Sequence, residues 1–182
     1  MAEPVLSVRD IQQSDIDIIR QYWFGADAAY LQSMGVDPAK LPAPDQFVQI
    51  MTEQMNTPVE KRMLYYVIWL LDGEPVGHCN TNPTAFGEEA YMHLHMWKLQ
   101  GRKKGLGTEF VKLALSRFFE NLQLKKLYCQ PYALNAAPNR TLEKAGFDFI
   151  AEFTTTPGRF NFEQPVKLWE MSVGKFKERV NS

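Results

Sequence analysis

The most informative segment of this chain reads Gln100-Gly-Arg-Lys-Lys-Gly-Leu-Gly-Thr108. It is rich in glycine, carries three consecutive cations and runs directly into an amphipathic segment. Glycine lets a backbone approach a ligand closely and adopt a positive φ. The first turn of a helix presents unpaired N–H groups and a partial positive charge. The segment therefore predicts a cradle for a phosphate group at the start of a helix.

Spacing excludes two common phosphate loops. A Walker A loop requires Gly, four residues and then Gly-Lys-Ser/Thr. Here the position five residues after Gly101 is Leu106, and no Lys-Ser/Thr pair follows Gly105 or Gly107. A dinucleotide loop requires Gly-x-Gly-x-x-Gly. Phe110 stands where its third glycine belongs, and a ring there would hinder the packing of helix on strand.

Length and charge limit the class of protein. The chain has 182 residues and a net charge of −1, and we expect residues 1–182 to form a single domain. A chain of this length buries enough surface for a self-sufficient core. Because the net charge is close to zero, we expect no general binding to nucleic acid. The basic cluster Arg102–Lys104 is local and suits a small anionic ligand.

Cysteine content and the amino terminus indicate a location. Cys79 and Cys129 could pair, but two cysteines make no disulfide framework, so a reducing, intracellular setting is favoured. The sequence Met-Ala-Glu-Pro-Val at the start lacks the basic and apolar regions of a signal peptide. The longest apolar run, Leu64–Leu71, is much shorter than a membrane span. We therefore expect a cytoplasmic protein without a membrane partner.

Residue periodicity predicts alternating strands and helices. We expect strands at Val5–Arg9, Leu64–Leu71, Pro75–Asn80, Tyr91–Trp97, Leu127–Pro131, Phe149–Thr154 and Lys167–Val173. We expect helices from Ser14 to Trp23, Ala26–Met34, Asp45–Asn56, Gly105–Asn121 and Asn135–Ala145, the first capped by Ser14. The chain would end on its last two strands. This order indicates an α/β (α+β) fold.

Two motifs carry a resemblance to a known family. Arg102-Lys-Lys-Gly105-Leu-Gly107 resembles the acetyl-CoA loop of the GNAT superfamily of N-acetyltransferases, Gln/Arg-x-x-Gly-x-Gly/Ala. Asn135-Ala-Ala-Pro-Asn-Arg-Thr-Leu-Glu-Lys-Ala-Gly-Phe147 resembles the family's second motif, in the form of the branch that contains ribosomal-protein N-terminal acetyltransferases. A well-capped helix would explain the second motif alone. The resemblance implies a mixed, mostly antiparallel sheet of about seven strands, flanked by helices and splayed between strands 4 and 5.

The resemblance also implies a site for acetyl-CoA, which acts as co-substrate. It implies no metal. Backbone amides from Lys103 to Thr108 would hold the CoA pyrophosphate, with the three cations adding charge unless they form a solvated loop. Asn135 would bind the pantetheine arm, Asn139 would assist, and the N–H of Trp97 would stabilise the developing oxyanion. The implied cofactor residues are Trp97, Arg102, Lys103, Lys104, Gly105, Leu106, Gly107, Thr108, Asn135 and Asn139.

The predicted fourth strand carries the candidate general base. Attack of an amine on a thioester requires loss of a proton, and imidazole suits that role near neutral pH. Strand alternation places His93 and His95 on one face together with Tyr91 and Trp97. Arylalkylamine acetyltransferases carry a similar His-x-His pair, and only His93 coincides with one of theirs. The alternative is that both are packing residues; we expect His78, on another strand, to be structural.

The group that protonates the departing thiolate is less evident. Many family members use a tyrosine in the second helix, but Leu142 occupies that position here. Tyr132 could substitute, although it and Tyr128 fit a packing role, and solvent could protonate the thiolate. The usual serine of the motif is Pro138. Cys129 has no base beside it in the sequence, which favours an inert core thiol.

These features predict transfer of acetyl from acetyl-CoA to a primary amine of a small molecule. The alternatives are a peptide or protein N-terminus as acceptor, or a CoA-binding regulatory domain without catalysis. We expect a monomer or homodimer. The acceptor site would lie between the Trp23–Pro44 region and the Thr154–Pro165 loop, whose candidate residues are Trp23, Phe24, Tyr30, Phe160, Phe162, Asp27 and Asp37. Core packing of the aromatics and solvated loops for the aspartates are the favoured alternatives.

Overall fold

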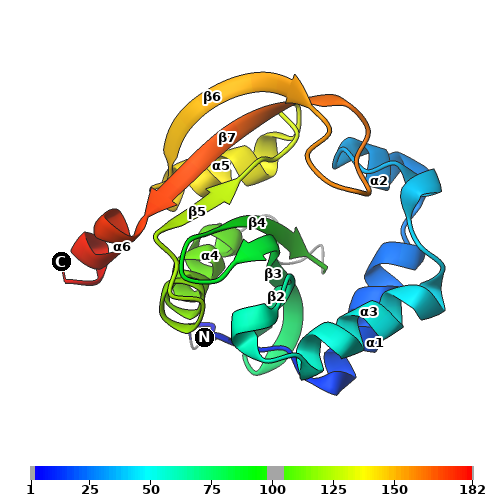
Figure 1. Ribbon diagram of the computed structural model, residues 1–182, viewed down its shortest axis with the longest axis horizontal. Helices are drawn as coiled ribbons and strands as arrows, with labels where there is room; N and C mark the ends of the chain where they lie inside the picture. The colour runs from blue at the N-terminus through cyan, green and yellow to red at the C-terminus, as the bar shows by residue number, and fades with distance from the viewer. Residues whose placement is uncertain (1–2, 98–104, 182) are drawn as a thin grey trace.

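Seven strands form one sheet in the order β1-β2-β3-β4-β5-β7-β6 (Figure 1). The computed structural model describes residues 3–97 and 105–181. Only β4 and β5 pair in parallel, and the other neighbouring strands are antiparallel. The strands are β1 (Leu6–Asp10), β2 (Tyr65–Leu71), β3 (Glu74–Ala85), β4 (Glu89–Met96), β5 (Lys126–Cys129), β6 (Asp148–Thr155) and β7 (Gln164–Ser172).

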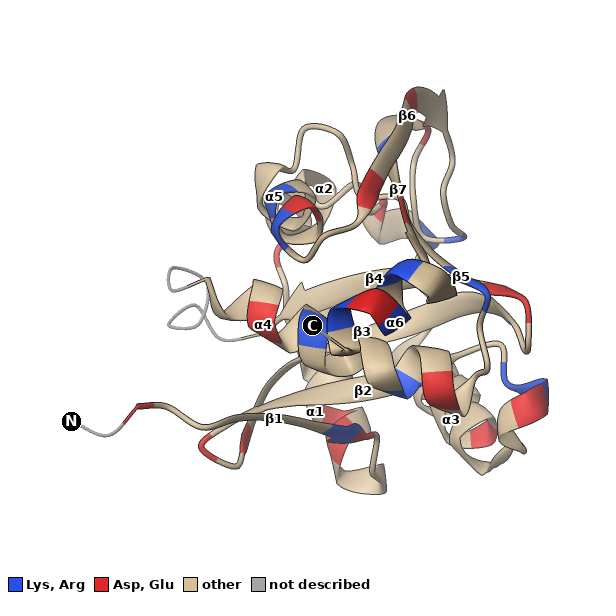
Figure 2. Ribbon diagram, turned by 90° about the vertical axis from the view of Figure 1, so that its left-hand side faces the viewer, with Lys and Arg blue, Asp and Glu red and all other residues tan. Residues whose placement is uncertain are grey.

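The sheet opens between β4 and β5. Their pairing ends at Tyr91 and Tyr128, whose rings stack 5.2 Å apart, while β4 continues to Met96. Figures 1 and 2 show β6, β7 and α5 (Ala136–Lys144) standing apart from the part of the sheet that contains β1 to β4. The predicted mixed sheet with a splay between its fourth and fifth strands is confirmed.

Helices cover both faces of the β1–β4 half. The remaining helices are α1 (Gln13–Phe24), α2 (Ala28–Ser33), α3 (Pro44–Asn56), α4 (Leu106–Ser116) and α6 (Val173–Val180), with 3-10 turns at Pro38–Lys40 and Val59–Lys61 and a π-helical turn at Arg117–Asn121. Successive residues of β2 show the two layers, because neighbours on a strand face opposite sides. Trp69 packs in the core that contains α4, whereas Ile68 packs in the core formed with α1 and α3.

Two predicted helix features were wrong. Ser14 does not cap α1; instead the Asp15 carboxylate accepts the N–H of Gln12 at 2.7 Å and binds the Arg9 guanidinium through two hydrogen bonds of 2.6 and 2.9 Å. The chain also ends on a helix, α6, which the sequence analysis missed. Ser172 is its N-cap, accepting from the N–H of Lys175 at 3.2 Å, and this serine was the available signal.

Both cysteines are free thiols in the core. Cys79 and Cys129 are buried, and burial raises the pKa of both thiols, that of Cys79 to about 12. Cys129 is therefore protonated at neutral pH, which agrees with the prediction of an inert thiol. Within residues 3–97 and 105–181, no helix is long and apolar enough to cross a membrane, and no group of three or more His, Cys, Asp or Glu side chains could hold a metal ion.

Candidate active site

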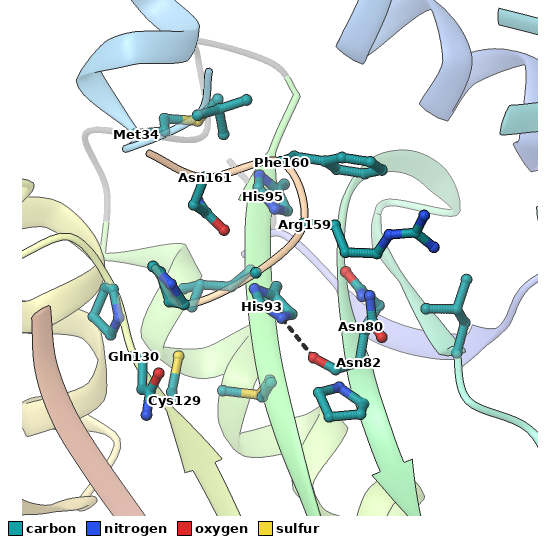
Figure 3. A pocket seen from close by; sticks show the side chains of 18 of the residues that line it. Met34, Asn80, Asn82, His93, His95, Cys129, Gln130, Arg159, Phe160 and Asn161 are labelled. Carbon is teal, nitrogen blue, oxygen red and sulfur yellow. Dashed lines mark hydrogen bonds between the residues drawn. The ribbon is translucent and has the colours of Figure 1, made fainter. Parts of the chain in front are cut away.

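A cavity of about 600 Å³ lies where β4 and β5 diverge. Its wall is formed by strand β4, the segment that follows β5, helix α3 and the β6–β7 loop. Figure 3 shows labelled side chains from β4, from the segment after β5 and from the β6–β7 loop. Polar lining residues include Gln54, Asn80, Asn82, His93, His95, Gln130, Tyr132, Asn135, Arg159, Asn161 and Gln164. Apolar and aromatic lining residues include Trp23, Met34, Val36, Phe47, Ile50, Met51, Met63, Leu64, Leu94, Pro138 and Phe160.

His93, the predicted general base, is held by a hydrogen bond to the backbone. Its Nε2 lies 2.9 Å from the carbonyl oxygen of Asn82 (Figure 3). A carbonyl can only accept, so Nε2 carries the hydrogen and Nδ1 keeps a lone pair in the neutral ring. Burial lowers the pKa of His93, against a smaller opposite effect of the Asn82 hydrogen bond. The ring is therefore neutral at pH 7 and able to accept a proton.

His95 lines the same cavity but belongs to a denser cluster. Its Nδ1 lies 3.1 Å from the Tyr22 hydroxyl, which lies 3.1 Å from that of Tyr30. The Trp23 ring is 4.8 Å away, centroid to centroid, and packs edge-on. His93 and His95 thus share a face of β4, as predicted, and differ in what holds them.

His78 is structural, as expected from the sequence. It is fully buried, and its Nδ1 accepts from the Trp97 indole N–H at 2.8 Å. Its ring lies 5.0 Å from that of His95. Burial lowers the pKa of His78 well below the ordinary 6.5, and repulsion from His95 and His93 adds to this effect.

The buried neutral His78 should make the protein less stable in acid. The folded-state pKa is lowered, so the unfolded state binds one more proton below about pH 6.5. Stability should therefore fall as pH drops through 6.5, by about 1.4 kcal/mol per pH unit for this residue. We expect His78→Gln to remove that share of the slope in urea unfolding between pH 7.5 and 5. An unchanged slope in the variant would show that His78 is protonated equally in both states.

The start of α4 fits a phosphate group. Gly105 adopts φ +70°, and a Cβ built there would meet nothing within 4 Å. The Thr108 N–H donates to the Gly105 carbonyl at 3.1 Å, which leaves the Leu106 and Gly107 amides at the positively polarised end of the helix. The predicted contributions of Arg102, Lys103 and Lys104 lie outside the described residues.

Replacing Gly105 should weaken cofactor binding through the backbone. An L-residue at this φ costs about 1–2 kcal/mol, so we expect Gly105→Ala to raise the Kd for CoA roughly fivefold or more. Gly107→Ala is the matched control, because that glycine is helical and its nearest atom would be the Thr141 hydroxyl at 3.7 Å. Isothermal titration calorimetry with CoA measures the Kd. An equal loss of CoA affinity in both variants would mean that the positive φ of Gly105 does not determine binding.

Comparison with known proteins agrees with this geometry. A profile of the acetyltransferase (GNAT) domain matches residues 6–148. The chain belongs to the GNAT acetyltransferase family. It is therefore an acetyltransferase whose co-substrate is acetyl-CoA, which confirms the resemblance drawn from the two motifs. A search of curated protein sequences returns no match.

Solved GNAT structures share the fold along nearly the whole chain. Aminoglycoside acetyltransferase AAC(6')-Ib with coenzyme A is 19% identical, with a TM-score of 0.72 over 98% of this chain and 100% of its own. RimL, a ribosomal alpha-N-protein acetyltransferase, is 12% identical, with a TM-score of 0.74 over 93% of this chain and 95% of its own. Spermidine N-acetyltransferase from Vibrio cholerae, in complex with CoA and spermine, is 16% identical, with a TM-score of 0.74 over 94% of this chain and 98% of its own.

Within this GNAT site, the side chain of Asn139 is buried and hydrogen-bonded to other parts of the protein. Its Nδ2 donates to the carbonyls of Tyr132 at 3.1 Å and Asn135 at 2.8 Å, and its Oδ1 accepts from Trp169 at 2.9 Å. Both N–H groups of its amide are therefore used within the protein, and its contact with the cofactor stays a prediction. Asn135 and Tyr132 both line the cavity. Leu142 is fully buried in the core, so it does not reach the site.

The backbone N–H of Trp97 does not fit its predicted role as the oxyanion donor. Its N–H donates to the Val76 carbonyl of β3 at 2.9 Å, so the sheet already uses it. Amides along a strand point alternately to its two sides. The N–H of Leu94, three residues earlier, therefore points away from β3, toward the opening beside β5. This alternation favours Leu94, which lines the cavity, as the oxyanion donor.

The acceptor side was predicted only in part. Trp23 and Phe160 line the cavity, whereas Phe24, Tyr30 and Phe162 do not. Asp27 and Asp37 are also absent from its wall; each carboxylate caps its own helical turn, accepting from Tyr30 N at 2.7 Å and Ala39 N at 3.0 Å. Four lining residues on α3 were not predicted: Phe47, Ile50, Met51 and Gln54. Their helical spacing was visible, but it did not show that this face covers a cavity.

Proposed function

We propose that this GNAT acetyltransferase transfers acetyl to the primary amine of a small molecule by direct attack, with His93 taking the proton. The hydrogen bond from His93 Nε2 to the Asn82 carbonyl carries this proposal. It fixes the ring within the cavity and leaves Nδ1 unprotonated. A positioned base of this kind contributes roughly 10²–10⁴-fold to the rate.

Contacts between two segments on the acceptor side support a small acceptor over a polypeptide. The β6–β7 loop is joined to the segment after α2, which lies next to it in Figure 1. The Asp37 N–H donates to the Phe160 carbonyl at 2.7 Å, and the Asn161 side chain donates to the Gly35 carbonyl at 2.9 Å. These bonds form a roof over the cavity, where a polypeptide acceptor would need an open groove.

Tyr132 is our candidate for protonating the thiolate that leaves. It lines the cavity, forms a backbone bridge with Val166 and packs edge-on against Phe162 at 5.8 Å. The alternative is that solvent protonates the leaving thiolate. A monomer or homodimer, a single domain and a cytoplasmic location stay predictions, the last supported by the two buried free thiols.

An acceptor screen tests the proposal. Thiol release from acetyl-CoA would be followed with small primary amines and with peptides that have free N-termini, and the products identified by mass spectrometry. We expect turnover of at least one small amine. Acetylation of peptides alone would favour an N-terminal acetyltransferase, which is the activity of RimL. CoA binding without thiol release from any amine would indicate a regulatory domain.

A further inference from the structure

The charge of the cavity wall restricts the acceptor. Among the described residues that line it, none is Asp or Glu, and the sequence of residues 98–104 contains neither. A buried ammonium requires a paired anion or several hydrogen-bond acceptors. A polyamine such as spermine, or an aminoglycoside, would place several ammonium groups against these lining residues, which offer no carboxylate. The cavity is therefore a poor site for a polycation.

Arg159 is the one cationic side chain in the described wall, apart from the two titratable histidines. It is exposed, it has no ion pair among the described residues, and it extends from the β6–β7 loop beside the cavity (Figure 3). A guanidinium without an acidic partner is suited to bind a carboxylate through paired hydrogen bonds.

The backbone that carries Arg159 is held in place. The turn from Gly158 to Asn161 is closed by the Asn161 N–H, which donates to the Gly158 carbonyl at 3.1 Å. The Lys40 ammonium donates to the Asn161 carbonyl at 2.7 Å. With the two bonds of the roof described above, these contacts fix the base of the Arg159 side chain over the cavity and leave its head free to meet a ligand.

The rest of the acceptor side is apolar with a few amide groups. Phe47, Met51 and Phe160 form apolar wall, which favours a hydrophobic body for the acceptor. Gln54 accepts the N–H groups of Met63 and Leu64 through its Oε1, at 2.8 and 3.0 Å. What Gln54 offers a ligand is therefore its Nε2 donor, which suits an anionic group better than an ammonium.

We propose that the acceptor is an apolar molecule with a single primary amine and a carboxylate, and that Arg159 binds the carboxylate. This rests on the proposed function. In the reaction the amine nitrogen forms a bond to the acetyl carbonyl carbon as the carbon–sulfur bond breaks. His93 takes the amine proton, and the thiolate receives a proton to give free CoA thiol.

Matched acceptors that differ only in the carboxylate test this. The pairs are phenylalanine with phenethylamine, and 6-aminohexanoate with hexylamine, which place the carboxylate near to and far from the amine. Spermidine and kanamycin represent polycations. We expect the carboxylate member of at least one pair to have a kcat/KM roughly 10-fold above its partner, the lower end for a charged hydrogen bond because Arg159 is exposed.

Arg159→Gln should remove that preference while leaving the KM for acetyl-CoA unchanged. Lys61→Gln is the matched control, since Lys61 is an exposed cation outside the cavity, and the preference should persist in it. Higher kcat/KM for spermidine or kanamycin than for every carboxylate, or a preference that survives Arg159→Gln, would overturn the proposal. Turnover of cationic amines alone overturns only this inference, whereas no turnover of any small amine overturns the proposed function.

Discussion

His93→Gln is expected to lower kcat by roughly 10²–10⁴-fold, the range for loss of a positioned general base. Glutamine keeps an N–H donor that can reach the Asn82 carbonyl, but it has no lone pair able to take the amine proton near neutral pH. The variant therefore removes the base and retains the hydrogen bond seen at 2.9 Å. Steady-state kinetics with saturating acetyl-CoA measures the change in kcat, and calorimetric titration of CoA should show unchanged affinity.

His95→Gln is the matched control for this variant. His95 is the same residue type, on the same strand and in the same cavity, but its Nδ1 is engaged with Tyr22 at 3.1 Å. We expect a much smaller loss of kcat than in His93→Gln. A larger loss at His95 would move the base to that residue, our second candidate, and would contradict the assignment to His93.

Phe110→Ala is expected to lower the free energy of unfolding by about 3–5 kcal/mol, as for other buried phenylalanines. Phe110 is fully buried in α4 and its ring stacks on that of Trp69 in β2, with centroids 5.2 Å apart and planes 3° apart. The substitution removes this aromatic pair and leaves a cavity between helix and sheet. Urea unfolding followed by circular dichroism measures the loss.

Leu113→Ala tests whether the loss arises from burial. Leu113 lies on the same helix but is 40% exposed, and exposed substitutions usually change stability by about 0.5 kcal/mol or less. A comparable loss in both variants would contradict the claim that packing of Phe110 against Trp69 stabilises α4, since alanine itself favours a helix. Because α4 begins at the predicted cofactor loop, the Phe110 variant should also bind CoA more weakly.

Much of the fold could be predicted because local patterns coincide with the tertiary structure. The alternation that places His93 and His95 on one face depends only on strand geometry, which the sheet preserves. The end of α5 follows from Gly146, which adopts φ +84°. The terminal helix α6 was missed because it is short and polar, with Phe176 as its one buried residue.

The missed parts of the site depend on contacts between distant segments. Asp27 and Asp37 are of a residue type that can bind amines, but each carboxylate accepts a hydrogen bond from a backbone N–H of its own helical turn. The partner of His93 is a backbone carbonyl, that of Asn82, which lies where the β3–β4 register shifts between Thr81 and Thr84. Backbone carbonyls are present at every residue, so no sequence pattern reveals which of them meets a histidine. The register shift places that carbonyl beside His93, and such a shift appears only when both strands are paired.

The pH dependence of kcat in the wild type and in His93→Gln tests the central claim most directly. Burial lowers the pKa of His93, so its base form is lost only when the pH falls below about 6.5. We predict that wild-type kcat falls in acid through one ionisation below that value, and that this limb is absent from the residual activity of His93→Gln. The ionisation of the acceptor is common to both profiles. The same acid limb in wild type and variant would contradict the role of His93 as the base.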